Sequence, residues 1–240
     1  MIKIENVEVL GWEHAIRGMR NPKNSWDRMD SISCSNRACD ECPRYTDANC
    51  PGQVYTFDGT TIAGEIGPND LGLMKRLAKG GPVHAKYRRM ITVYLDITAP
   101  LYWWKEFDTY KVGTVANSCS TMHKIHDKEF ELEDFSCEHL FEGAMYGFQE
   151  VVRWLNFYRE EFLKTKDKDY WWQLIQLLPS SYNQKRTIML NYEVLVGMYE
   201  HRKSHKLDEW REFCKWVESL PYSELITGKF EKGGEGGEVN

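Results

Sequence analysis

The stretch 99–124 holds the side chains that are best placed to bind a polar ligand. It opens with an aromatic segment whose apolar residues recur at helical spacing, namely Leu101, Trp104 and Phe107. Pro100 suits the first turn of a helix, so we expect this segment to be helical. Such a helix would present three polar side chains near its end: Glu106, Tyr110 and Lys111.

The segment that follows this expected helix is rich in hydroxyl and amide groups. Within eight positions these come from Thr114, Asn117, Ser118, Ser120 and Thr121. The segment lacks the Pro and the charged residues of a plain solvated connector. It therefore predicts a loop that hydrogen-bonds to a polar ligand, and the alternative is a capped loop leading to the next helix.

Four of the seven cysteines lie within 17 positions, namely Cys34, Cys39, Cys42 and Cys50. In a reducing compartment, thiolates this close in sequence favour a tetrahedral zinc site over two disulfides. The alternative is a set of free thiols in a variable loop. The other three cysteines are scattered, and neither Cys119 nor Cys137 lies in a motif typical of a nucleophile.

The composition is that of an ordinary globular protein. The chain has 240 residues, 42% of them hydrophobic, which is enough for one large domain or two small ones. Its net charge of −5 argues against nonspecific binding to nucleic acid. An anionic ligand would therefore have to be bound by a local cationic pocket.

Neither a membrane span nor a signal peptide is expected. No apolar run approaches the roughly 20 residues that a membrane-spanning helix needs. Residues 1–5 alternate like a strand, whereas a signal peptide would have an unbroken apolar stretch. We therefore expect a cytoplasmic protein.

The order of periodic segments indicates an α/β chain of the α+β type, in which a mixed sheet is flanked by helices. Strands are predicted at 2–9, 90–98 and 186–192, and helices at 14–20, 68–79, 136–164, 169–178, 192–201 and 207–220. Residues 31–67 are predicted to be a Cys-rich insertion with a hairpin at 53–61. The main domain then comprises 1–30 and 68–228, and 229–240 is expected to be a disordered tail.

Two further features have open interpretations. His84 follows a glycine turn between two helical segments, where it is either a ligand-binding group or a structural histidine. The longest periodic segment, 136–164, is either a core helix or an oligomer helix. We expect its Trp154, Phe157 and Tyr158 to take part in packing.

Two separated stretches resemble the flavin-dependent thymidylate synthases. That family has an Asn, an Arg eleven positions later and a Trp beyond it, with a Leu-Pro upstream, and the matching residues here are Asn191, Arg202, Trp210 and Leu178-Pro179. In the central stretch, His84 matches the His of the family's Gly-His turn, and Ala99-Pro100 matches its Ala-Pro. The resemblance covers about 68–125 and 175–217.

The chain also departs from the family at its signature motif. The Arg-His-Arg falls on 109–111, which read Thr-Tyr-Lys, and the Ser-x-Arg-Tyr falls on 119–122. A substrate Arg becomes Ile175, and an Arg two positions after the family's Asn becomes Glu193. Thr and Ile cannot supply the positive charge and the paired hydrogen-bond donors of an Arg guanidinium, so several phosphate-binding cations are missing.

The resemblance implies an FAD enzyme that methylates dUMP or a related pyrimidine deoxynucleotide, with NADPH and methylene-tetrahydrofolate as cosubstrates. It implies a homotetramer with shared active sites and no protein nucleophile. The implied flavin contacts are His84, Tyr110, Lys111, Thr114, Asn117 and Asn191. The implied substrate contacts are Arg202, Ser120, Glu106 and Thr121.

Two other functions remain open from the sequence. One is a noncatalytic flavin- or nucleotide-binding homologue that has lost the synthase activity, which the missing cations favour. The other is a metal-stabilised interaction module built on the segment from Cys34 to Cys50.

Overall fold

The computed structural model describes residues 2–31, 55–57, 60–62 and 66–230. Within these residues, six strands form one sheet in the order β2-β3-β1-β4-β6-β5. The strands are β1 (Lys3–Leu10), β2 (Tyr55–Phe57), β3 (Thr60–Ile62), β4 (Thr92–Pro100), β5 (Val115–Ser118) and β6 (Asn183–Asn191). The sheet is mixed, as predicted, because β1 and β3 are parallel while the other neighbouring strands are antiparallel.

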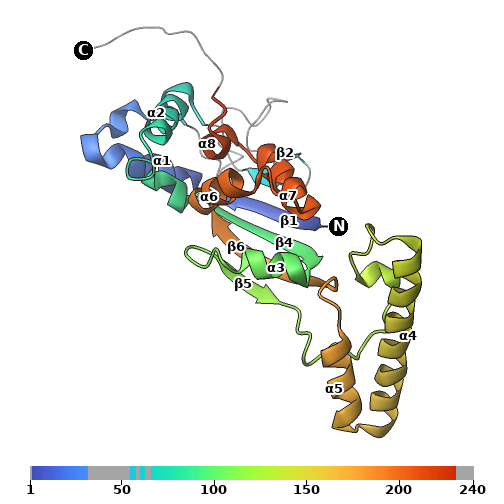
Figure 1. Ribbon diagram of the computed structural model, residues 1–240. Coiled ribbons are helices and arrows are strands. Elements are labelled where there is room, and N and C mark those ends of the chain that lie inside the picture. Colours follow the sequence, from blue (N-terminus) through green and yellow to red (C-terminus); the bar gives the residue numbers. More distant parts are fainter. Residues whose placement is uncertain (1, 32–54, 58–59, 63–65, 231–240) are drawn as a thin grey trace.

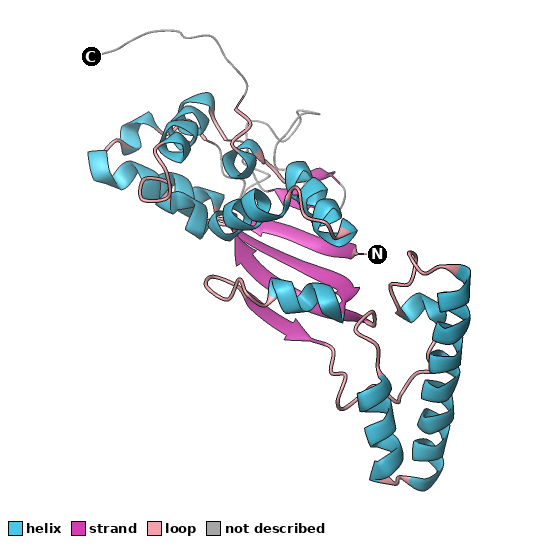
Figure 2. Cartoon of the chain, in the orientation of Figure 1, coloured by secondary structure: helices cyan, strands magenta, loops and turns pink. Residues whose placement is uncertain are grey.

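Most helices gather around the sheet, as Figures 1 and 2 show. The α-helices are α1 (Trp12–Arg20), α2 (Pro68–Lys79), α3 (Leu101–Phe107), α4 (Glu142–Thr165), α5 (Lys168–Leu177), α6 (Tyr192–Arg202), α7 (Asp208–Ser219) and α8 (Glu224–Thr227). Short 3-10 turns are η1 (Asn21–Lys23), η2 (Trp26–Arg28), η4 (Lys86–Met90) and η5 (Leu132–Asp134). The α+β class predicted from the sequence is confirmed.

The main core lies between the sheet and the helices that cover it. Alternate residues of β4 are fully buried, as their apolar side chains and the two-residue period of a strand require: Val93, Leu95, Ile97 and Ala99. Against them packs an aromatic cluster that joins α3 to α7. In it, the ring centroids of Trp103 and Trp210 are 4.8 Å apart. This contact ties the short helix α3 to a helix a hundred residues later in the chain.

Helices α4 and α5 form an arm that extends away from the sheet (Figure 1). The arm has a small core of its own, centred on Leu155 and Leu174. Several of its large side chains remain exposed, and Phe141, Trp154 and Phe157 have exposed fractions of 88%, 51% and 46%. Trp154, Phe157 and Tyr158 contact one another through their rings, as expected for residues that take part in packing, while about half of the surface of Trp154 and of Phe157 stays exposed.

The structure corrects several predicted boundaries. The helix after Pro100 ends at Phe107, and Pro100 itself is the last residue of β4 and the N-cap of α3. The predicted ligand-binding loop contains the edge strand β5, which pairs with β6. The long helix begins at Glu142 rather than at residue 136.

The predicted hairpin at 53–61 is present as β2 and β3, and it extends the main sheet through the pairing of β3 with β1. The four clustered cysteines, Cys34, Cys39, Cys42 and Cys50, lie outside the described residues. Of the predicted tail, Lys229 and Phe230 are described and Lys229 pairs with Glu218; residues 231–240 lie outside. No helix in the described part of the chain is both long and apolar enough to cross a membrane.

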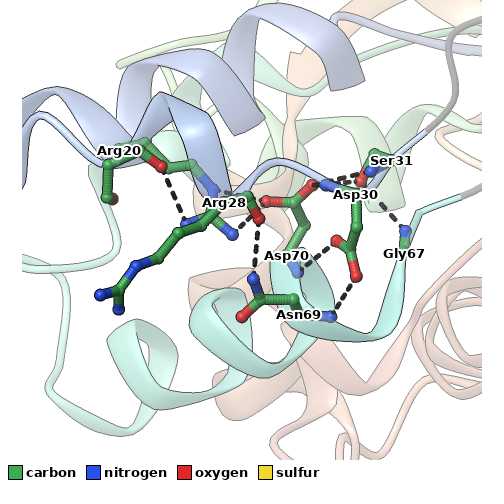
Figure 3. A network of polar contacts seen from close by, with 8 residues as sticks. Arg20, Arg28, Asp30, Ser31, Gly67, Asn69 and Asp70 are labelled. Carbon is green, nitrogen blue, oxygen red and sulfur yellow. Dashed lines mark hydrogen bonds and ion pairs between the residues drawn. The ribbon is translucent and has the colours of Figure 1, made fainter.

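A buried carboxylate, Asp70, joins α1, α2 and the chain that follows η2 (Figure 3). Its side chain is 0% exposed and accepts hydrogen bonds from Arg20 Nε at 2.6 Å and Ser31 Oγ at 2.6 Å. The backbone amides of Asp30 and Ser31 add two more. Burial opposes ionisation, but these hydrogen bonds outweigh it and lower the pKa of Asp70 below its usual value.

Removal of this carboxylate should destabilise the protein strongly. Asp70→Ala leaves the Arg20 guanidinium, which is 2% exposed, without its counter-charge, so we expect the free energy of unfolding to fall by about 3–5 kcal/mol in urea titrations. The exposed Asp27→Ala is the control and should change it by less than about 0.5 kcal/mol. Equal small effects of both variants would contradict this role for Asp70.

Candidate functional site

The centre of the candidate site is Glu106, the last but one residue of α3. Its Oε2 accepts hydrogen bonds from Arg202 Nη1 at 2.5 Å and from Trp210 Nε1 at 3.1 Å, and it lies 3.3 Å from His205 Nε2. These donors come from the end of α6, from α7 and from the segment between them. One carboxylate therefore fixes where α6 and α7 stand relative to α3.

Arg202 is held through two of its three guanidinium nitrogens within this network. Its Nε donates to the Tyr110 hydroxyl at 2.9 Å, and its guanidinium carbon lies 4.7 Å from the Trp210 ring centroid. The side chain is 17% exposed. Arg202 is thus a positioned guanidinium rather than a surface residue at a helix end, and no described residue accepts a hydrogen bond from its Nη2.

Asn191 brings a second part of the chain to this region. It caps α6, because its Oδ1 accepts the Val194 amide at 3.1 Å. A side-chain carbon at Gly113 would lie 3.2 Å from Asn191 Nδ2, and Gly113 has a φ of +81°, so glycine lets the turn before β5 approach Asn191. Thr114 donates its hydroxyl to the Tyr110 carbonyl and closes this turn.

His84 lies in a different hollow, a cleft of about 1390 Å³ between α1, the η1–η2 segment, α2 and η4. The His84 side chain is exposed there. Beside it, the Tyr87 hydroxyl donates to the Met74 carbonyl at 2.9 Å and links η4 to α2. Burial raises the pKa of Tyr87 to about 12, so this donor stays protonated at neutral pH.

The remaining predicted residues are placed apart from the Glu106 network. Lys111 is exposed in the turn after Tyr110, and Asn117 is exposed on β5, where it pairs with Thr187. Ser120 lies beyond the other end of β5 and accepts the amides of Met122 and His123 in a tight turn that also contains Thr121. A single chain therefore groups Glu106, Tyr110, Thr114, Asn191 and Arg202, but it does not bring Ser120 or Thr121 to them.

Sequence reasoning missed two parts of this region. His205, 18% exposed, contacts Glu106 and carries no motif of its own. Glu193, at the position where the family has an Arg, faces the buried Arg88, with 3.7 Å between Oε2 and Nη1. The reversal of charge at 193 is thus matched by a cation on η4, which could have been found only from the fold.

A scan against protein-family models and a search of curated proteins gave no match. Among solved structures, the chain is similar to the flavin-dependent thymidylate synthase ThyX from Helicobacter pylori, crystallised with FAD and dUMP. One such structure has 15% identity and a TM-score of 0.59, with 95% of this chain and 98% of that chain covered. A second has 16% identity and a TM-score of 0.62, with 94% and 98% covered. The chain therefore has the fold of flavin-dependent thymidylate synthases, which confirms the predicted resemblance at the level of the fold.

The Glu106 network can be tested by removing its charge alone. Glu106→Gln keeps the shape but leaves Arg202 without a counter-charge, so we expect the free energy of unfolding to fall by about 1.5–3 kcal/mol. Glu160→Gln, at an exposed helical ion pair with Lys164, is the control and should change it by less than about 0.5 kcal/mol. If both variants unfold at the same urea concentration as the wild type, Glu106 does not organise this region.

Proposed function

We propose that the protein transfers a one-carbon unit to a pyrimidine deoxynucleotide, dUMP or a close relative, in a flavin-dependent reaction with methylene-tetrahydrofolate and NADPH. The observation that carries this proposal is the shared fold, over 94–95% of the chain, with solved structures that contain FAD and dUMP. We propose that it does so in the cytoplasm.

The residues present fit a flavin nucleotide. The proposed FAD contacts are His84, Tyr110, Lys111, Thr114, Asn117 and Asn191. Antiparallel pairing brings the start of β4, the end of β6 and the start of β5 to one end of the sheet, with Thr92 opposite Asn191 and Val115 opposite Met189. This end of the sheet offers aromatic ring faces, hydroxyls and an amide. FAD bound there would carry the one-carbon unit, which these side chains cannot do.

The proposed nucleotide contacts are Arg202, Ser120, Glu106 and Thr121. Arg202 is the strongest of them, because Glu106 and Tyr110 fix its Nη1 and Nε and leave Nη2 for an anionic ligand. A fixed guanidinium loses little conformational freedom on binding. Its role would be to hold and orient the phosphate, while the flavin carries the reacting group.

We propose a homotetramer in which a second copy completes each site. Ser120 and Thr121 lie beyond the end of β5 that is opposite to Asn191, which supports a site to which a second copy contributes residues. The exposed Phe141, Trp154 and Phe157 on the arm are apolar surface that association would bury.

A second candidate function is a noncatalytic homologue that binds flavin or nucleotide. Thr109, Thr121 and Ile175 stand where the family has cations, and this favours it. The zinc site at Cys34, Cys39, Cys42 and Cys50 stays a prediction, since these residues lie outside the described part of the chain.

Binding of FAD tests the first requirement of this function. We expect the purified protein to carry or take up FAD, seen as visible flavin absorbance and quenched flavin fluorescence. Asn191→Ser keeps a helix-capping oxygen but removes the amide donor, so it should weaken FAD binding by about tenfold with little loss of stability. Asp167→Ser, which changes the N-cap of α5 on the arm, is the matched control and should leave FAD binding unchanged. A colourless protein that does not quench added FAD would contradict the proposal.

Binding of nucleotide tests the role of Arg202. Loss of a charged hydrogen bond to an anion costs on the order of 2–5 kcal/mol, so Arg202→Ala should weaken dUMP binding by well over tenfold while FAD stays bound. Arg202→Lys keeps a positive charge next to Glu106, so this variant should fold like the wild type. A loss of dUMP affinity in Arg202→Lys therefore reports a defect in binding and not in folding. Arg211→Ala, at an exposed ion pair with Asp208, is the control. Titration with dUMP, UMP, dCMP and dTMP would also name the substrate, and equal affinity of wild type and Arg202→Ala would reject the assignment.

A further inference from the structure

Arg186 on β6 is a second arginine that the fold holds in a fixed position. Its Nη1 lies 2.8 Å from Asp108 Oδ1, and its Nε donates to Gln184 Oε1 at 3.0 Å. Its guanidinium carbon lies 4.2 Å from the ring centroid of Trp104. No described residue accepts a hydrogen bond from its Nη2, and this nitrogen is not enclosed by the protein. Arg186 therefore keeps one donor group that is open to a ligand.

Arg202 is held in the same way. Each of the two arginines has its Nη1 beside a carboxylate at the end of α3, and each guanidinium lies against an indole ring. A stacked guanidinium with two fixed nitrogens loses little conformational freedom when it binds an anion. The arrangement that prepares Arg202 for a ligand is thus repeated at Arg186.

The buried Gln184 side chain ties Arg186 to the turn 119–122. Its Nε2 donates to the Cys119 carbonyl at 2.7 Å, while its Oε1 accepts from Arg186. Because an arginine can only donate, the orientation of this amide group is unambiguous. The Cys119 amide in turn donates to the Lys185 carbonyl at 2.9 Å. The guanidinium of Arg186 therefore has a fixed position relative to this turn.

Ser118 adds a hydroxyl beside Arg186. The two residues lie directly opposite each other on β5 and β6. Directly opposed residues project from the same face of a sheet, with their Cβ atoms about 4.5–5.5 Å apart. Ser118 is exposed, and its hydroxyl forms no hydrogen bond with any described residue. A guanidinium donor and a hydroxyl this close together can bind one phosphate group.

The ion pair with Asp108 does not explain why a cation stands at this position. Asp108 is 48% exposed, and ion pairs with an exposed partner contribute little to stability. Arg186 shares its face of β6 with the buried Gln184, Ile188 and Leu190, and its own side chain is only 14% exposed. Withdrawing a charge from water in this way is unfavourable for folding. Such a departure from the pattern of a strand is typical of a binding residue.

We propose that Arg186 and Ser118 bind the phosphate group of the nucleotide, together with Ser120 and Thr121. The inference rests on the proposed function for the identity of the ligand. Each of Arg186 and Arg202 is partly offset by its own carboxylate, so two guanidiniums suit a phosphate dianion better than one. In the proposed homotetramer, the copy that supplies Ser120 and Thr121 to a site would supply Arg186 as well.

Calorimetric titration of the full chain with dUMP and with deoxyuridine tests this role. Arg186→Met keeps an apolar contact with Trp104 but removes the charge, so it should weaken dUMP binding by at least about tenfold. Deoxyuridine has no phosphate and should bind equally to both proteins. Arg153→Met, at an exposed ion pair with Glu150, is the matched control and should change neither affinity. Unchanged affinity for dUMP, or an equal loss of affinity for both ligands, would overturn the proposal.

A variant with the opposite expected effect excludes a folding defect as the explanation. Asp108→Asn removes the carboxylate that competes with the ligand for Arg186, so dUMP should bind about two- to fivefold more tightly. The double variant with Arg186→Met should bind dUMP as weakly as Arg186→Met alone. Glu150→Gln is the matched control and should leave the affinity unchanged. Equal or weaker binding by Asp108→Asn would show that the ion pair is structural and would overturn the proposal.

Titration with inorganic phosphate separates this proposal from the proposed function. Phosphate binding that is lost in Arg186→Met, in a protein that does not methylate dUMP, would support the anion site and contradict the proposed function. Methylation of dUMP with the same KM in wild type and Arg186→Met would support the proposed function and overturn the role of Arg186. A wild-type protein that binds neither dUMP nor phosphate would overturn the anion site.

Discussion

The antiparallel register between β4 and β6 is the constraint on which the rest of the structure depends. The two strands pair over nine consecutive positions, from Thr92 opposite Asn191 to Pro100 opposite Asn183. A shift of one residue would turn every side chain of one strand to the opposite face, and the buried apolar residues of β4 make such a shift costly. The register therefore fixes Asn191 at the end of the sheet where η4 and the turn before β5 also lie.

Two carboxylates, Asp70 and Glu106, fix the positions of the helices that pack around the sheet. Asp70 binds Arg20 and three other donors where α1 meets α2, and Glu106 binds Arg202 where α3 meets α6 and α7. Asp70 is buried and Glu106 is half-buried. A charge withdrawn from water is costly unless several partners compensate it, and each of these two carboxylates has at least three. Both also hold segments that carry candidate ligand-binding groups. The same interactions thus serve the fold and the site.

Local patterns in the sequence were sufficient to predict most of the fold. The apolar period and the flanking Pro and Gly of α2 gave its limits, and the β-branched residues of 92–98 gave β4. The edge strand β5 was missed because it is short and polar and has no alternation, so its strand structure comes from pairing with β6. The end of α3 at Phe107 was missed for a related reason, since the turn that follows is set by contacts with α6.

The candidate site was less predictable than the fold. The sequence indicated Arg202 through its spacing from Asn191, but the partner that holds it, Glu106, lies 96 positions earlier. Likewise, Arg28 on η2 and Lys86 on η4 lie far apart in the sequence, and only the fold brings them to the same cleft. Pairings over such distances depend on tertiary structure, which no window of sequence contains.

The most direct test of the central claim is turnover. The protein, supplied with FAD, is incubated with dUMP, methylene-tetrahydrofolate and NADPH, and the nucleotides are separated by chromatography and identified by mass. The account predicts a methylated pyrimidine deoxynucleotide that does not form when FAD or the folate is omitted. Bound FAD and bound dUMP with no new nucleotide would contradict it, and would identify the protein as a binding homologue of the synthase fold.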